Sequence, residues 1–158
     1  MKRLVMKKIF LVLLLCLAPE IMLQAQVHAF LNYKGGADAV NFSFLERDNK
    51  IYLSINFDSY FNSFPEQSQV LMRFFDDSVL QLDGVRIQKD QTREGGWLIK
   101  NDMFHSTAEY IIKKEEIESF KIGIKKIRVI TVPNILEKSY KKDKLGKKLY
   151  KLYTESAF

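Results

Sequence analysis

The sequence predicts a mainly β domain: an antiparallel meander or sandwich of about seven strands, with a short helix and a C-terminal amphipathic helix. Short runs in which apolar and polar residues alternate have the period of a half-buried strand. Clusters of Asp, Asn and Gly, which favour turns, separate these runs. Only the last segment of the chain changes to a helical period.

The clearest strand covers residues 51–58, where one face is apolar throughout. Residues 40–45 alternate in the same way, and the polar cluster 46–50 lies between the two runs, so we expect a hairpin. The remaining expected strands are residues 69–75, 79–82, 85–87, 97–99, 105–112 and 124–131. We expect residues 26–38 to be irregular, with a turn at the paired glycines, and residues 89–96 to form an exposed loop. Asp83-Gly84 predicts a reversal of the chain.

Two segments have helical spacing. Within residues 113–120, Ile117 and Phe120 lie three residues apart among charged residues, which predicts a short helix covering one end of the sheet. Near the C-terminus three leucines recur at helical intervals from Leu145, and Asp143 precedes them as a candidate N-cap. We expect this helix to pack its leucines on the sheet, because a short helix is marginal in water by itself.

The N-terminal residues have the pattern of a secretory signal peptide. Four cations precede an apolar core from Ile9 to Ala18, which is too short to span a membrane. We expect cleavage after Ala25, which makes residues 1–25 a signal peptide and residues 26–158 a single β-rich domain without a transmembrane helix. The predicted location is the periplasm or outer envelope, with secretion as an alternative.

The sole cysteine, Cys16, lies inside this signal and would leave with it, so we expect no disulfide. An alternative is that Cys16 is the lipidated first residue of a lipoprotein. The bulky Leu15 disfavours that alternative, since lipid-attachment signals typically have a small residue before the cysteine.

Positive charge is concentrated at the C-terminus. The formal net charge is +6, but residues 26–112 carry a net −4 and residues 113–158 a net +7. This asymmetry permits attraction to an anionic membrane surface. A solvated face of a surface helix is the plainer alternative, and the segment lacks arginine, the better bidentate phosphate ligand. The candidate residues are Lys141, Lys142, Lys144, Lys147, Lys148 and Lys151. We expect no nucleic acid as a partner for an exported protein.

The loop after residue 58 carries aromatic side chains where loops are usually polar. Tyr60, Phe61 and Phe64 are therefore candidates for contact with a protein partner. Packing of these rings over the end of the sheet is the alternative. Trp97 is expected in the core or at its rim rather than in a ligand site.

The sequence favours a non-enzymatic protein without a cofactor or metal. No nucleophile elbow, phosphate loop or metalloprotease motif is present. His105, with Asp102, Ser106 and Glu109 nearby in sequence, leaves a hydrolase as an alternative. The aspartates at 76, 77 and 83 do not have calcium-loop spacing and are expected to stabilise turns.

Three segments and the lysine-rich end resemble small uncharacterised exported β-rich proteins of Bacteroidetes-type bacteria. The segments are Arg73–Leu80, Ala108–Ile117 and Gly123–Arg128. The resemblance implies a periplasmic or outer-envelope location and no particular activity. Asp77-Ser78-Val79 also resembles the short acceptor pattern for O-glycosylation in such bacteria, which implies a sugar on Ser78.

These observations predict an exported envelope protein that acts as a protein-binding or adaptor module. The alternatives are a binder of anionic envelope surfaces, a hydrolase that uses His105, and a purely structural envelope component.

Overall fold

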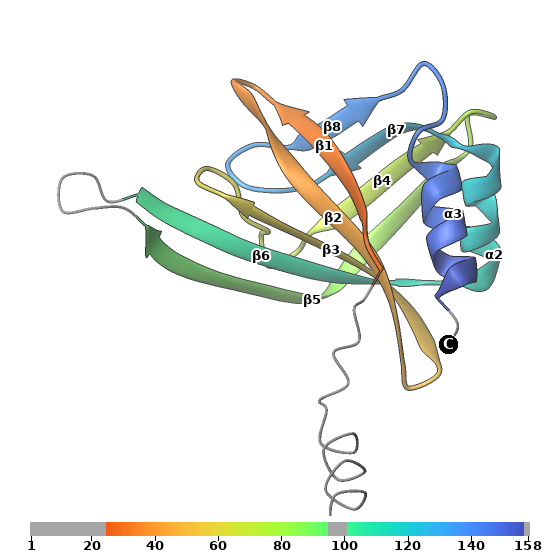
Figure 1. The fold of residues 1–158 in the computed structure, drawn as a ribbon, viewed down its shortest axis with the longest axis horizontal. Helices are drawn as coiled ribbons and strands as arrows, with labels where there is room; N and C mark the ends of the chain where they lie inside the picture. The colour runs from red at the N-terminus through yellow and green to blue at the C-terminus, as the bar shows by residue number, and fades with distance from the viewer. Residues whose placement is uncertain (1–24, 95–100, 157–158) are drawn as a thin grey trace, which may run out of the picture.

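A computed structural model describes residues 25–94 and 101–156, and within them the chain forms a closed antiparallel barrel of eight strands (Figure 1). The order around the barrel is β1-β2-β3-β6-β5-β4-β7-β8. The strands are β1 Val27–Tyr33, β2 Gly36–Arg47, β3 Lys50–Ser59, β4 Gln69–Phe74, β5 Val79–Glu94, β6 Asn101–Ile112, β7 Ile124–Val129 and β8 Leu136–Ser139. The mainly β prediction is confirmed, whereas the seven-stranded meander or sandwich is wrong.

The predicted hairpin over residues 40–58 is confirmed as β2 and β3. Phe42 pairs with Ile55 and Phe44 with Leu53, so the apolar faces of both strands point into the barrel. The turn between them places Asp48 and Asn49 at positive φ, a conformation that these residue types tolerate.

Closure of the barrel depends on strands that the sequence did not predict. Residues 26–38, expected to be irregular, contain β1, which pairs with β2 along its whole length. The short β8 was also missed, and it joins β7 to β1. In the described part of the chain, β1 and β8 are joined through one residue pair, Asn32 with Glu137. A strand of four residues such as β8 has too short a pattern to be recognised from sequence.

Asp83-Gly84 does not reverse the chain, because β5 continues through it to Glu94 and includes most of the expected loop 89–96. The register with β6 shifts between Gly84 and Arg86, which marks a bulge. The Gly84 N–H donates to the carbonyl of Ser68 (2.8 Å), and a Cβ at this position would lie 3.1 Å from that oxygen. The glycine therefore permits close backbone approach rather than a turn.

Beyond the bulge, β5 and β6 extend past the barrel body as a two-stranded ribbon (Figure 1). The predicted strand 97–99 lies within residues 95–100, outside the described residues.

Large apolar side chains fill the barrel interior, as expected for eight strands. The largest fully buried ones are Phe42, Phe44, Phe57, Phe64, Phe74, Tyr110 and Phe120. In the part of the chain that the structure describes, no helix is long and apolar enough to cross a membrane.

Two helices close one end of the barrel (Figure 1). They are α2 (Lys114–Glu118), which continues into the 3₁₀ turn η1 (Ser119–Ile122), and α3 (Gly146–Glu155). Both predicted helices are thus confirmed. Phe120 lies between the rings of Phe44 (6.4 Å) and Phe74 (6.2 Å), and Tyr153 of α3 meets Phe44 edge-on at 5.5 Å.

Asp143 binds the first turn of α3 and the start of β7, but the N-cap of α3 is Leu145 and not Asp143 as predicted. Its carboxylate accepts the N–H groups of Leu145, Gly146 and Lys147, and also that of Ile124 (3.1 Å). Gly146 allows this contact between helix and strand, because a Cβ there would lie 2.8 Å from the Ile124 nitrogen. One carboxylate therefore fixes where the helix begins relative to the barrel.

Tyr110 gives the barrel a pH-dependent stability. Its buried hydroxyl hydrogen-bonds the Ser68 hydroxyl (2.7 Å), and burial raises the pKa of Tyr110 far above its usual value of about 10. The unfolded chain releases this proton first as pH rises, so the stabilisation is complete below pH ~10 and declines above it.

We predict that Tyr110→Phe is about 1 kcal/mol less stable than wild type at neutral pH, through loss of the hydrogen bond. Above pH ~10 the wild type should lose about 1.4 kcal/mol per pH unit relative to the variant, so the two stability curves cross. Urea unfolding at a series of pH values measures this. Parallel curves would contradict the assignment. Ser68 keeps a partner in the variant, since it also donates to the carbonyl of Ile130.

Candidate functional site

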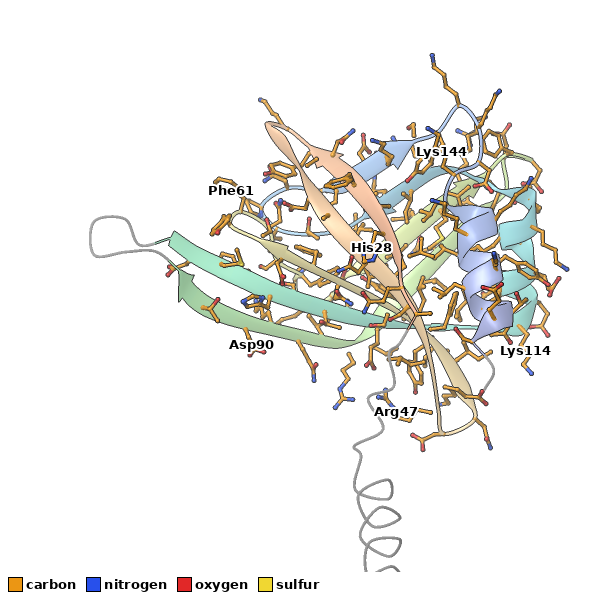
Figure 2. The ribbon with its side chains drawn as sticks, in the orientation of Figure 1. His28, Arg47, Phe61, Asp90, Lys114 and Lys144 are labelled. Carbon is orange, nitrogen blue, oxygen red and sulfur yellow. The ribbon has the colours of Figure 1, made fainter. Side chains whose placement is uncertain are left out.

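Six residues around the start of α3 line a depression of about 360 Å³, which we call the lysine depression. They are Lys138, Ser139, Tyr140, Lys141, Lys142 and Lys144. The predicted lysines therefore divide into two groups. Lys141, Lys142 and Lys144 lie in the segment before the helix, whereas Lys147, Lys148 and Lys151 are exposed on α3 itself. Figure 2 shows Lys144 on this segment, above the start of α3.

The segment that carries the lysine depression is anchored to the barrel on both sides. The Tyr140 N–H donates to the carbonyl of Lys125 on β7 (2.8 Å). Three residues later, Asp143 accepts its four backbone N–H groups. Tyr140 is half-buried, and burial together with the nearby Asp143 carboxylate raises the pKa of its phenol. The phenol therefore stays protonated at neutral pH and is able to donate a hydrogen bond.

Most lysines of this region lack a carboxylate partner of the kind that the three cations of β7 have. Within the described residues, no carboxylate lies at ion-pair distance from the four lysines of the depression, nor from Lys147 or Lys148. Lys151 approaches Glu155 only at 3.6 Å. Elsewhere, Lys125 binds Asp77 (2.8 Å) and Arg128 binds Glu137 (3.0 Å). Unpaired positive charge is thus concentrated around the start of α3.

The aromatic loop lies at the other end of the barrel, and its three rings have different environments. Phe61 is 64% exposed and Tyr60 45% exposed, whereas Phe64 is 0% exposed. The Phe64 ring meets Phe57 edge-on at 5.0 Å inside the barrel. Phe64 therefore packs over the barrel end and is not available as the partner contact that the sequence predicted. Figure 2 shows Phe61 far from Lys144.

Two further apolar side chains lie beside this loop. Ser63 and Val132 form an isolated β-bridge, with N–H to carbonyl bonds of 2.9 Å in both directions. This bridge joins the loop to the β7–β8 connection, on which Val132 and Ile135 are exposed. We call Tyr60, Phe61, Val132 and Ile135 the apolar end. A neighbouring depression of about 600 Å³ is lined by Asn32, Tyr33, Lys34, Arg128, Pro133, Asn134, Ile135 and Glu137.

Asn62, which the sequence analysis missed, holds the apolar end in place. Its buried amide donates to Asp38 (2.7 Å) and accepts from the amide of Asn134 (2.9 Å). The Ser59 hydroxyl oxygen accepts the backbone N–H groups of Phe61 and Asn62. These bonds fix the loop, so Phe61 is presented from a rigid support. The sequence around this asparagine gave no sign of the role, because its partners lie 24 and 72 residues away.

His105 has different partners from those expected. Its Nδ1 lies 2.7 Å from Asp58 Oδ1 and its Nε2 lies 2.8 Å from Thr92 Oγ1. Of the expected partners, Ser106 is buried on the inward face and Glu109 binds Arg47 (2.8 Å). The hydroxyl–imidazole–carboxylate order is that of a nucleophilic triad. However, the Asp58 side chain is 64% exposed, so water screens the pair in a way that an active site avoids. The geometry gives the hydrolase alternative little support.

The remaining predicted positions are readily placed. Ser78 is exposed on the β4–β5 turn, where its hydroxyl donates to Asp76 (2.6 Å). Asp76 also accepts the Ser78 N–H, and these bonds lower the pKa of its carboxyl group, as expected for a turn aspartate. Among the described residues no cluster of three or more His, Cys, Asp or Glu side chains could hold a metal ion. Residues 1–24 of the predicted signal peptide, which include Cys16, lie outside the described residues. Trp97 also lies outside them.

Comparisons with protein-family models, with curated proteins and with solved structures found no match. Function must therefore be argued from the two surfaces at the ends of the barrel.

The two phenylalanines of the loop provide a direct test of this end of the barrel. We predict that Phe64→Ala costs about 3–5 kcal/mol of stability, through lost burial and a cavity, whereas Phe61→Ala changes stability by less than about 0.5 kcal/mol. Urea unfolding of both variants measures the difference. Equal losses would show that the loop does not present Phe61 outward.

Proposed function

We propose that this protein is a non-enzymatic binding protein of the cell envelope that attaches to an anionic surface through its lysines. The observation that carries the proposal is a group of lysines gathered around the start of α3; in the described part of the chain only Lys151 among them has a carboxylate partner, Glu155 at 3.6 Å. We call this group the lysine surface: Lys138, Lys141, Lys142, Lys144, Lys147, Lys148 and Lys151. Export, predicted from the N-terminal sequence, supports contact with the envelope.

Electrostatics is sufficient for such attachment. A lysine near an anionic membrane contributes about 1 kcal/mol, and the contribution decays within a Debye length of about 8 Å in physiological salt. Lysines already paired with carboxylates contribute less, since their partner is repelled by the same surface. The pairing of Lys125 and Lys126 on the neighbouring strand therefore lowers their contribution relative to that of the lysine surface.

We predict that the chain starting at Gln26 binds phosphatidylcholine vesicles doped with phosphatidylglycerol, and that binding weakens as ionic strength rises. A variant with Lys142, Lys144, Lys147 and Lys148 changed to Gln should bind at least about 30-fold more weakly. The matched control changes Lys34, Lys50, Lys89 and Lys114 to Gln, removes the same charge elsewhere, and should lose less than about threefold. Vesicle flotation measures both.

Two results would contradict the proposal. One is binding that is unaffected by ionic strength, and the other is an equal loss in the two fourfold variants, which would mean that only net charge matters.

A second candidate function is a protein contact through the apolar end. Exposed aromatic side chains on a rigid support are typical hot spots, because little conformational entropy is lost when they bind. Phe61 meets this description, since its loop is fixed through the buried Asn62. The adaptor function and attachment to an anionic surface are compatible, since the two surfaces lie at different ends of the barrel.

For this candidate we predict that Phe61→Ala abolishes crosslinking to an envelope protein that the wild type captures. Phe30→Ala is the matched control, because Phe30 is 66% exposed on β1 and is not part of the apolar end. Quantitative mass spectrometry of crosslinked envelope extracts gives the readout. Equal capture by wild type and Phe61→Ala would exclude the apolar end as the contact.

A further inference from the structure

We propose that the lysine depression is a discrete binding site for a phosphomonoester group. The inference rests on the proposed function in that both use some of the same lysines. It goes further in naming the chemical class of the ligand and in separating the lysines that line the hollow from those on α3.

The size of the hollow limits the ligand. At about 360 Å³ the depression is at the lower end of the range for small-molecule sites, roughly 300–1,000 Å³. That space accommodates a phosphate group with one attached glycerol or sugar unit. A long polyanion or a folded partner would contact the rim and α3 instead.

The charges of the lining indicate more than one negative charge on the ligand. Four lysines line the hollow, and its lining contains no carboxylate. Two acids flank the lining residues in sequence: Asp143 is engaged by four backbone N–H groups, and Glu137 is engaged by Lys126 and Arg128. A phosphomonoester carries a charge of about −1.5 to −2 at neutral pH and three acceptor oxygens, whereas a phosphodiester carries about −1. The monoester therefore matches this set of donors better.

The kind of donor also discriminates between anions. A lysine ammonium is a compact charge with three rotatable donors, while planar carboxylates are best bound by the fork of an arginine. Arginine is absent from the lining of the depression. The protonated phenol of Tyr140 adds a neutral donor to the ammonium groups. A tetrahedral group with several oxygens is the ligand that suits this mixture.

Rigidity separates the depression from the rest of the lysine surface. Its backbone is held by the Tyr140 N–H bond to Lys125 and by the bonds to Asp143. Lys138 follows Glu137, whose carboxylate is bound by Lys126 and Arg128 on β7. The four ammonium groups therefore start from fixed backbone positions, which reduces the entropy lost on binding. By contrast, Lys147 and Lys148 project from the exposed side of α3 and act as separate charges.

The test compares two triple variants that remove equal charge. In one, Lys138, Lys141 and Lys142 are changed to Gln; in the other, Lys147, Lys148 and Lys151 are changed to Gln. Each is measured against phosphatidylcholine vesicles containing phosphatidic acid, a phosphomonoester, or phosphatidylglycerol, a phosphodiester, at matched surface potential. Circular dichroism melting confirms that both variants are folded.

We expect wild type to prefer phosphatidic acid roughly fivefold, since the monoester carries more negative charge and accepts more charge-assisted hydrogen bonds from the lysines. The α3 triple variant should bind both vesicles more weakly and keep this preference. The depression triple variant should lose it. Equal binding of wild type to both vesicles, or the same preference in both variants, would overturn the proposal while leaving the proposed function intact.

A soluble probe tests the site independently of membranes. Glycerol 3-phosphate titrated into ¹⁵N-labelled protein should shift amide signals within residues 138–147. If glycerol 3-phosphate also displaces the protein from phosphatidic acid vesicles, free phosphate esters are ligands; if it shifts signals only weakly, the headgroup in a membrane is the ligand. Shifts spread over all lysines, or no shifts, would overturn the site even if vesicles bind.

Discussion

The carboxylate of Asp143 is the interaction on which the arrangement of the C-terminal half depends. It accepts N–H groups from the first turn of α3 and from Ile124 at the start of β7, so one side chain joins the helix to the barrel wall. Without this junction, α3 would be positioned by its apolar side and by Tyr150, whose hydroxyl donates to Glu118 (3.2 Å) and whose ring contacts Lys121. Apolar contacts are non-directional, and they would leave the helix start, and hence the preceding lysines, without a defined place.

The other end of the barrel is organised in the same way. The buried amide of Asn62 joins the loop after β3 to Asp38 on β2 and to Asn134 on the β7–β8 connection. In both places a single polar side chain with satisfied hydrogen bonds ties together segments that are distant in sequence. Each junction presents a different surface: ammonium groups at the helical end and apolar side chains at the other. Such a barrel can hold two ligands of different chemistry apart.

Local signals in the sequence were sufficient for the hairpin of β2 and β3, for both helices and for the link between Asp143 and the start of α3, although the N-cap itself is Leu145. Their determinants lie within a few residues of one another. Closure of the barrel was not predictable, because β8 is four residues long and β1 resembles a loop until its pairing with β2 is known. The lysines were found by composition, but their division between depression and helix depends on where α3 begins. His105 was paired with sequence neighbours, whereas in a sheet its neighbours come from other strands: Asp58 and Thr92.

The central claim is that geometry held by Asp143, and not charge alone, makes the start of α3 a binding site. Asp143→Asn and Asp143→Ala each remove one negative charge and so raise the net charge by one unit. Only Asn keeps an oxygen able to accept the N–H groups at the start of the helix. The decisive measurement is the affinity of both variants for phosphatidic acid vesicles. The account predicts that Asp143→Asn binds at least as tightly as wild type and that Asp143→Ala binds more weakly despite its extra charge. Equal or tighter binding by Asp143→Ala would contradict it.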